Sequence, residues 1–496
     1  MHPRTMLSLR PLAVFLLLAG ALPARAPAAV AADPLEGTWT GRVRAPQGET
    51  AEIGFDFLRE RDGSLGFKLY FPAMFTHGAS LGIPVEVTGT NDYAITPAFA
   101  ITLHRDGDTL TGTFSAGQLP LELQRGGPVP APLPVAAHPP GPAPLWRYAL
   151  GAGTWAPPLA ADNVIYLGGG DGRFHAVNAV DGTAVWTWAG PNAIDGCAAL
   201  DADAVYFLDV KYNLVALDRR RGTLRWRVPL HNEFLAGRSA PDNPTFNHRA
   251  ATPLLHDGVL YVGSSDGGVY ALDPATGARL WRHDAGAPVY SGIGWYEPDT
   301  LAFGTMDGSV VLLDRQTRRE TLRVKTGGGV VTTPLIVGDR VIAGSRDYQL
   351  YAFNRRDGSV AWKFSYWFSW IESTPALHDG LLYVGGSDYA RVTAIDPVTG
   401  RARWGTIVHG MDWGTPLVTD RAVFIGTVNQ NVPGTLINHT AGLVKLDRAT
   451  GTVLWQLILP KAAEGRFAGY AGSLALVGNK VVGAGFDGFL AAYPAE

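Results

Sequence analysis

Apolar and polar residues alternate in short segments along residues 33–126, for example in "TWTGRVRA", "AEIGFDFL" and "SLGFKLYF". Turn sequences such as "RDGS" and "RDGD" separate these segments. Alternation with a period of two is typical of antiparallel strands that bury one face, and the turns favour hairpins between them. The pattern therefore predicts a small antiparallel β-barrel domain over residues 33–126.

A second pattern begins at residue 144 and returns roughly every forty residues, which is the length of one four-stranded propeller blade. In one unit the strand-like segments read "ATPLLHD", "VLYVGSS", "GVYALD" and "ARLWRHD". The recurring "DG" and "TG" pairs suit tight turns that need a positive φ. The fourth segment carries a tryptophan that we predict to pack between adjacent blades, at Trp146, Trp186, Trp226, Trp281, Trp362, Trp404 and Trp455, with Leu322 in the equivalent place of one unit.

The two ends of this repeated region complete each other. The last unit, "GYAGSLALVGNKVVGAGFDGFLAAYPAE", contains only three predicted strands. The segment "PLWRYAL" at the start of the region has the pattern of a fourth strand, but the first three strands of a unit do not precede it. Pairing the two closes a ring and removes exposed sheet edges. The sequence thus predicts an all-β protein in which an eight-bladed β-propeller over residues 144–496 is closed by an N-terminal strand and is preceded by the small barrel.

Two further segments flank these regions. Residues 127–143, "GPVPAPLPVAAHPPGPA", form a proline-rich linker that favours an extended, semi-rigid conformation. Residues 1–31 combine basic residues, the apolar run "PLAVFLLLAGAL" and the small-residue cleavage site "AVA". We interpret them as a signal peptide, and we expect a periplasmic or secreted protein with no transmembrane anchor after cleavage.

Composition narrows the possible chemistry. The net charge is −3 and charged residues make up 17% of the chain, which argues against a nucleic-acid partner. Cys197 is the only cysteine, so the sequence offers no intramolecular disulfide, no covalent haem motif and no cysteine for a lipid anchor. Electrons from a redox reaction would therefore have to pass to a separate electron acceptor.

The loops that enter the first strand of each unit hold aromatic, acidic and basic residues in place of ordinary turn residues. Two long insertions, residues 231–249 and 427–442, fall on the same face by the topology of a propeller. Aromatic faces beside a few charged groups are typical of a small-molecule site, so we predict a ligand site at this channel mouth. The residues in these loops are Trp155, Asp195, His248, Arg249, Tyr290, Thr332, Thr333, Trp370, Glu372, Asp412, Trp413, Arg466 and Tyr470.

The repeats "ALDPATGARLW", "AIDPVTGRARW", "KLDRATGTVLW" and "AVNAVDGTAVW" resemble the tryptophan-docking repeats of pyrroloquinoline-quinone (PQQ) propellers. That resemblance implies the propeller fold. It leaves the function open, because the family includes quinoprotein alcohol and sugar dehydrogenases as well as non-catalytic outer-membrane-assembly propellers. Residues 33–126, with "GTWTG" and "TGTFSAGQLPLELQR", resemble small calycin-like barrels.

In the dehydrogenases of this family a tryptophan stacks on the quinone, and a bound calcium ion activates the quinone carbonyl. The stretch "DWGTPLVTDRAVFIGTVNQN" resembles the family segment that supplies the stacking tryptophan and an asparagine ligand. The resemblance therefore implies stacking by Trp413 and calcium binding by Asn429 or Asn431. The next entering loop reads "GRFAGYAG" and carries Arg466 where the family has an aspartate.

A match shifted by one blade gives a different assignment. Asp412 then becomes the aspartate that binds calcium and acts as the catalytic base, and Trp370 becomes the stacking residue. Asp388 and Asp347 would take the other ligand places. The remaining cofactor-binding candidates are Glu372, together with Arg249 and Arg466 as anchors for the quinone carboxylates.

The sequence supports more than one functional hypothesis. In the first, the propeller binds a small-molecule ligand or substrate at its mouth, most concretely as a PQQ- and calcium-dependent oxidoreductase of an alcohol or sugar. In the second, it is a non-catalytic scaffold that binds protein segments in the cell envelope. A lyase or hydrolase that uses the histidines of the inserted loops, His248 and His439, is a third alternative.

Overall fold

The computed structural model describes residues 33–496 except 75, 81–82, 96–100, 115–118, 135, 231–250 and 431–439. Within these ranges the regular elements are strands, apart from the short 3-10 helix η1 (Pro72–Met74). None of the helical structure described is long and apolar enough to cross a membrane. The predicted signal peptide over residues 1–31 lies outside the described residues.

The first part of the chain forms a curled antiparallel sheet of nine strands, which we call the N-terminal sheet. Its inward face is apolar, with Trp39, Phe55 and Leu123 fully buried, as the alternating pattern predicts. The sheet stays open where a closed barrel was predicted, because the described residues of its edge strands β4 and β5 do not pair with each other. Its strands are β1 (Gly37–Arg44), β2 (Thr50–Arg59), β3 (Leu65–Phe71), β4 (Thr76–Ser80), β5 (Glu86–Val87), β6 (Asp92–Ile95), β7 (Ile101–Asp106), β8 (Thr109–Phe114) and β9 (Leu119–Arg125).

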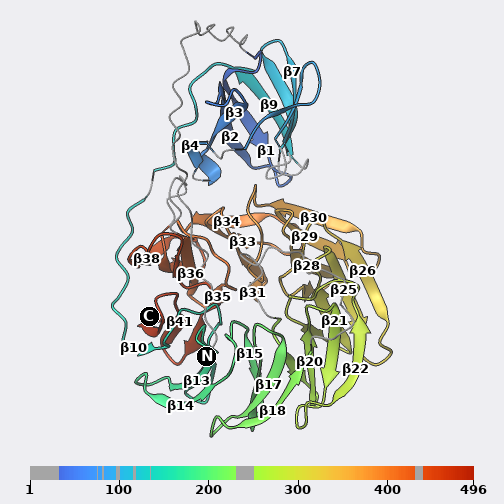
Figure 1. Cartoon of the computed structure of the whole chain (residues 1–496), viewed down its shortest axis with the longest axis vertical. Helices are drawn as coiled ribbons and strands as arrows, with labels where there is room; N and C mark the ends of the chain where they lie inside the picture. The colour runs from blue at the N-terminus through green and yellow to red at the C-terminus, as the bar shows by residue number, and fades with distance from the viewer. Residues whose placement is uncertain are drawn as a thin grey trace, which may run out of the picture.

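The repeated region forms eight antiparallel sheets arranged around a ring, as Figure 1 shows. Within each blade, the four main strands of the sheet are paired in sequence order, except in the last blade. There the early strand β10 pairs with the final strand β42, with Trp146 opposite Ala492. The predicted eight-bladed ring and its closure by an N-terminal strand are confirmed.

The first four blades run in chain order around the ring. Blade 1 contains β11 (Leu159–Ala161), β12 (Val164–Gly168), β13 (Arg173–Asn178) and β14 (Ala184–Ala189). Blade 2 contains β15 (Ala198–Leu200), β16 (Ala204–Leu208), β17 (Asn213–Asp218) and β18 (Leu224–Pro229). Blade 3 contains β19 (Leu254–His256), β20 (Val259–Gly263), β21 (Gly268–Leu272) and β22 (Arg279–Asp284). Blade 4 contains β23 (Gly294–Tyr296), β24 (Thr300–Gly304), β25 (Ser309–Asp314) and β26 (Glu320–Lys325).

The other four blades complete the ring. Blade 5 contains β27 (Leu335–Val337), β28 (Arg340–Gly344), β29 (Gln349–Asn354) and β30 (Val360–Ser365). Blade 6 contains β31 (Ala376–His378), β32 (Leu381–Gly385), β33 (Arg391–Ile395) and β34 (Ala402–Ile407). Blade 7 contains β35 (Leu417–Val418), β36 (Ala422–Gln430), β37 (Gly442–Asp447) and β38 (Val453–Ile458), and β39 (Phe467–Gly469) pairs with the end of β36. Blade 8 contains β40 (Ala475–Val477), β41 (Lys480–Ala484), β42 (Phe489–Pro494) and β10 (Trp146–Ala149).

Five of the repeated tryptophans join their blade to the next, as predicted, through an indole hydrogen bond and a contact with a turn glycine. The indole Nε1 of Trp362 in blade 5 donates to the carbonyl oxygen of Pro397 in blade 6 at 3.0 Å. The ring packs on Gly400, where φ is 69° and a Cβ would lie 2.6 Å from the indole. The glycine is therefore needed both for the turn and for the close approach of the ring. Trp146, Trp186, Trp226 and Trp404 make the equivalent contacts.

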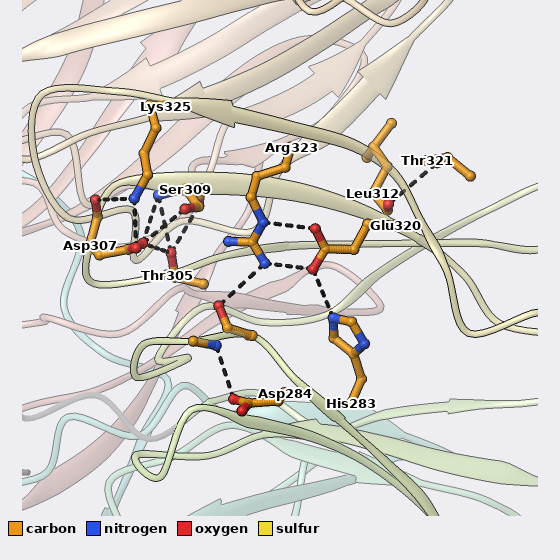
Figure 2. A network of polar contacts seen from close by, with 12 residues as sticks. His283, Asp284, Thr305, Asp307, Ser309, Leu312, Glu320, Thr321, Arg323 and Lys325 are labelled. Carbon is orange, nitrogen blue, oxygen red and sulfur yellow. Dashed lines mark hydrogen bonds and ion pairs between the residues drawn. The ribbon is translucent and has the colours of Figure 1, made fainter.

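The contact between blades 3 and 4 departs from this rule. Arg318 replaces the glycine with a φ of 59°, and its guanidinium carbon lies 5.9 Å from the Trp281 ring centroid. A polar network adds to the contact (Figure 2): Glu320 accepts a hydrogen bond from Arg323 and lies 2.9 Å from the Nε2 atom of His283. Charged side chains thus supplement the missing glycine contact at the boundary between blades 3 and 4.

The proline-rich linker follows the outer edge of blade 7. The carbonyl oxygen of Pro139 accepts a hydrogen bond from the backbone nitrogen of Gln456 at 2.9 Å. Gly141 N donates to the carbonyl oxygen of the same Gln456, also at 2.9 Å. The linker therefore adds a short parallel segment to the edge of β38 before the chain enters β10.

Candidate functional site

A cavity of about 290 Å³ lies on the axis of the ring and is called the axial cavity below. It opens on the mouth, the face that carries the loops entering each first strand and the turns between second and third strands. Each of the eight blades contributes one residue from just before its first strand. These residues are Pro157, Cys197, Thr252, Gly292, Thr333, Thr374, Thr415 and Ser473.

The wall of the axial cavity is rich in hydroxyl groups. Thr374 Oγ1 accepts a hydrogen bond from the backbone nitrogen of Thr333 at 3.2 Å, and Ser473 Oγ accepts one from Thr415 N at 2.8 Å. A hydroxyl that accepts such a bond still carries its own proton, so it can donate a hydrogen bond to a ligand. Burial raises the pKa of Tyr290, which also lines the cavity, although the positive charge of Arg346 opposes the shift. The phenol therefore stays protonated at neutral pH.

A larger groove of about 1190 Å³ adjoins the axial cavity and shares Trp155 and Asp195 with it. Residues 457–470 form one side of this outer groove, and blades 8 and 1 form the other. Its charged lining comprises the cations Arg147, Lys461 and Arg466 and the carboxylates Asp195 and Asp487. Three cations against two carboxylates leave one positive charge, which favours an anionic ligand group.

An aromatic cluster separates the outer groove from the axial cavity. The rings of Trp155 and Trp413 stack with centroids 5.3 Å apart. Phe467 packs edge-on against both indoles, at 5.4 Å and 5.7 Å, and Phe486 lies 4.8 Å from Trp155. Trp413 Nε1 also donates to Ser387 Oγ at 2.7 Å, which fixes the orientation of that ring. Trp413 is only 5% exposed as a result.

A second group of polar residues, the Arg346 cluster, lies at the mouth between blades 5 and 6. Arg346 pairs with Glu372 at 2.6 Å, and its guanidinium carbon lies 4.7 Å from the Trp370 ring centroid. Burial raises the pKa of Asp388 to about 6, and the nearby charge of Glu372 adds to the shift. Burial also raises the pKa of Tyr348, with further contributions from Asp388 and other charges. Asp388 is therefore the group of this cluster that is closest to titrating at neutral pH.

Asp412 lies deep in the wall of the mouth and is 1% exposed. Its backbone nitrogen donates to the carbonyl oxygen of Gly386 at 3.2 Å. A Cβ built on Gly385 would overlap the carboxylate of Asp412, so only glycine at that position leaves room for the aspartate. The carboxylate is consequently held against blade 6 and away from bulk solvent.

The structure brings some of the predicted site residues together. Trp370 and Glu372 meet through Arg346, and Asp412 and Trp413 both bond to the segment 386–387 of blade 6. Arg466 lines the outer groove, where it is exposed. Asn429 lies in the ladder between β36 and β39, opposite Ala468. Arg249, His248, Asn431 and His439 fall outside the described residues.

The described residues do not fit a calcium-bound quinone in this arrangement. A quinone needs an open indole face, but Trp155 and Phe467 cover Trp413. In the shifted assignment, Arg346 lies over Trp370, while Asp347 accepts hydrogen bonds from Gly327 N and the Tyr351 hydroxyl. The described part of the chain also holds no group of three or more histidine, cysteine, aspartate or glutamate side chains placed to bind a metal ion.

Two features of the site were not predicted from the sequence. The first is the set of hydroxyl groups that line the axial cavity. Four of them belong to the recurring pair Thr-Pro in "ATPLL", "TTPLI", "STPAL" and "GTPLV", so the sequence contained a signal for them. Arg346 lies in the turn between β28 and β29, which the propeller topology places at the mouth. Its pairing with Glu372 depends on contact between two blades, which the local sequence does not encode.

Comparison with known proteins places the propeller in a family. The family model for outer membrane protein assembly factor BamB matches residues 135–267, 265–367 and 366–495. The assembly factor BamB of Shewanella oneidensis is 28% identical over 206 residues, which cover 38% of this chain and 47% of that protein. The quinoprotein alcohol dehydrogenase PedH of Pseudomonas putida is 29% identical over 156 residues, covering 27% of this chain and 25% of that protein. The chain thus matches about half the length of the first relative and a quarter of the second.

A solved structure supports the same fold. The quinohemoprotein alcohol dehydrogenase from Comamonas testosteroni superposes with a TM-score of 0.53 at 15% identity. The superposition covers 71% of this chain and 76% of the dehydrogenase. At this identity the likeness establishes the propeller architecture alone.

Proposed function

Because this chain belongs to the family described as outer membrane protein assembly factor BamB, whose repeats it shares with quinoprotein dehydrogenases, we propose that it is a binding propeller that takes up a small ligand at its mouth. The observation that carries the proposal is the pair of adjoining cavities that share Trp155 and Asp195. Ligand sites are typically concave, with aromatic walls and a few convergent polar groups. Both cavities have this character.

The lining of the two cavities indicates the class of ligand. The axial cavity offers hydroxyl donors from Thr374 and Ser473, which suit a polyhydroxylated group. The outer groove has a net positive lining that includes the exposed Arg466, which suits an acidic group. We therefore propose a small polyhydroxylated compound with one anionic end.

Thermal unfolding of the full chain with gluconate, sorbitol or acetate tests this proposal. Gluconate combines hydroxyls and a carboxylate, sorbitol has only the hydroxyls, and acetate has only the charge. A ligand that binds the folded state raises the unfolding midpoint by mass action. We expect gluconate to raise it most. The absence of a shift with all three compounds would contradict the proposed ligand class.

Variants assign the two halves of the site. Thr374→Val removes one hydroxyl with little change in volume, and Arg466→Gln removes the groove charge. Each should weaken gluconate binding about five- to tenfold, the effect of one lost hydrogen bond or exposed charge contact. Arg403→Gln serves as the matched control, since it removes an exposed positive charge from the outer strand β34. Equal weakening by Arg466→Gln and Arg403→Gln would point to a general charge effect.

A quinoprotein oxidation of an alcohol or sugar is the enzymatic form of the first hypothesis, and the similarity to PedH supports testing it. The aromatic cluster would have to open before a quinone could stack on Trp413. Calorimetric titration of PQQ, with and without calcium, decides this point. Calcium-dependent binding that is lost in Asp412→Ala would favour the dehydrogenase, and no heat at any calcium concentration would exclude it.

A second candidate function is the binding of extended protein segments in the cell envelope. The specific observation in its favour is the linker, which adds a strand-like segment to the edge of β38 through two backbone hydrogen bonds at Gln456. Strand addition at a sheet edge is a common mode of peptide recognition. Co-purification of the intact chain with one reproducible envelope protein, unchanged by gluconate, would support this function over the first.

A further inference from the structure

One side chain of the N-terminal sheet binds the propeller backbone. Gln47, in the turn between β1 and β2, donates from Nε2 to the carbonyl oxygen of Ser365 at 3.0 Å. Its Oε1 accepts a hydrogen bond from the backbone nitrogen of the same Ser365, also at 3.0 Å. The amide thus satisfies both backbone groups of Ser365, as a neighbouring strand would. Ser365 is the last residue of β30 and the first of the segment 365–374, which connects blades 5 and 6.

The same turn also holds a second loop of blade 6. Glu49 Oε1 accepts a hydrogen bond from Arg391 Nη1 at 2.9 Å and one from the Tyr389 hydroxyl at 3.3 Å. Arg391 and Tyr389 belong to the segment 386–391, which joins β32 to β33. Two side chains from a single turn therefore fix two separate loops.

Aromatic packing completes this contact. Trp367 and Phe368 of the segment 365–374 pack against Phe71 and Phe114 of the N-terminal sheet. The Phe114 and Phe368 centroids are 3.9 Å apart, and Trp367 is fully buried. These residues belong to one continuous apolar core that extends from the sheet into blades 5 and 6. Figure 1 shows the sheet beside β30 and β34 at the rim of the ring.

The far ends of both loops carry residues of the mouth. Glu372 pairs with Arg346, Trp370 lies against the same guanidinium, and Thr374 lines the axial cavity. In the second loop, Asp388 directly precedes Tyr389. The two loops are joined near the mouth, because Ser387 N donates to the carbonyl oxygen of Trp370 at 3.2 Å.

We propose that the N-terminal sheet is a positioning domain for the mouth, in which Gln47 and Glu49 hold the segments 365–374 and 386–391 in place and thereby set the geometry of the Arg346 cluster and of Thr374. The sheet's own core is filled by aromatic side chains, including Phe55, Phe57 and Phe67. Its contribution is thus mechanical: it adds anchors on the outer side of two loops that also make hydrogen bonds within the propeller.

Hydrogen exchange of the full chain tests the proposal without any ligand. Gln47→Ala removes both hydrogen bonds to Ser365, while Gln47→Glu keeps the acceptor and removes the donor. The reporters are the amides of Ser369, which donates to the Tyr366 carbonyl oxygen, and of Ile371, which donates to that of Ser345. We expect exchange about tenfold faster in Gln47→Ala and an intermediate rate in Gln47→Glu.

Arg42→Gln is the matched control, because Arg42 lies in the same sheet and forms an exposed ion pair with Glu52. It should leave the exchange of Ser369 and Ile371 unchanged. Wild-type exchange of these amides in Gln47→Ala would overturn the proposal. So would equal acceleration in Arg42→Gln, since that would indicate general destabilisation of the sheet.

Only the expected effect of the N-terminal sheet on ligand binding rests on the proposed function. A binding measurement with gluconate tests that effect separately. If gluconate binds the wild type, Gln47→Ala should weaken it through the loosened Thr374. Faster exchange in Gln47→Ala with no gluconate binding by the wild type would uphold the positioning role and contradict the proposed ligand class. Unchanged exchange in Gln47→Ala, with normal gluconate binding by the wild type, would contradict the positioning role and support the proposed ligand class.

Discussion

Replacing Arg346 with alanine should lower the free energy of unfolding by about 3–5 kcal/mol, because the change leaves a buried carboxylate without its cation. The Arg346 and Glu372 side chains are only 13% and 9% exposed, and the closest nitrogen–oxygen distance is 2.6 Å. Two unit charges about 4 Å apart attract each other by about 4 kcal/mol at an effective dielectric constant of about 20. The loss of this attraction sets the size of the expected effect.

A double-mutant cycle isolates the pair from the packing of the arginine stem. Arg346→Met with Glu372→Gln removes both charges and keeps side chains of similar size. We expect this double variant to unfold within about 1 kcal/mol of the wild type, since a neutral buried pair carries no uncompensated charge. Each single charge removal should cost more than the double change. The coupling between the two positions should therefore reach about 3 kcal/mol.

Urea unfolding at neutral pH, followed by tryptophan fluorescence and by circular dichroism, measures these differences. Coincident transitions would justify two-state free energies. The exposed pair between Arg42 and Glu52 gives the comparison, since Arg42→Ala should change the stability by less than about 1 kcal/mol. A coupling energy near zero for Arg346 and Glu372 would refute the reasoning, because it would mean that solvent already screens the pair.

Three further predictions concern single side chains. Asp388→Asn should stabilise the protein above about pH 6 by about 1–2 kcal/mol, which is half of what the pKa shift from 3.8 to about 6 implies, since the residue is partly exposed. The folding stability of the wild type should fall as the pH rises from about 4 to 6, because the folded state keeps the proton longer than the unfolded chain. The stability of the variant should not change over this range. Identical pH profiles would contradict this. Burial lowers the pKa of His175 below its usual 6.5, so the unfolded chain binds the proton first and stability should decrease as the pH falls through about 6.5, an effect that His175→Gln should reduce in thermal melts. Trp362→Ala should cost about 3–5 kcal/mol in urea unfolding because the indole packs between blades and donates to Pro397, whereas Trp362→Phe should cost less; equal losses would show that the ring itself contributes nothing.

The fold of the propeller could be predicted from the sequence because its determinants are local and repeated, whereas the closure predicted for the N-terminal sheet was wrong. Most blades repeat the turn glycines, the two-residue alternation and the tryptophan of the fourth strand. A strand that is hard to assign in one unit can therefore be assigned by comparison with the other units. The contact between the N-terminal sheet and blade 6 was not predictable in this way. It depends on Gln47, Glu49 and a few aromatic side chains, none of which belongs to the repeated pattern of the blades.

The site was predicted less completely, for a physical reason. Topology placed Trp370, Trp413 and Asp412 at the mouth, but whether an indole face is open depends on side chains from distant blades. Trp155 belongs to blade 1 and covers a residue that precedes blade 7. Likewise, the partner of Glu372 comes from another blade. Such contacts follow from ring closure and not from any local pattern.

Ring closure also has a consequence for the order of folding. Among the propeller strands β10 is synthesised first and paired last, because its partner β42 is the last of them in chain order and 340 residues separate Arg147 from Asp487. The entropy of closing this loop exceeds that of closing one blade by only about 2 kcal/mol, so the delay is kinetic more than energetic. Until β42 arrives, the blades form an open arc with two unpaired edges. Two such arcs at high concentration could exchange their first strands, so dilution during refolding should favour the monomeric ring.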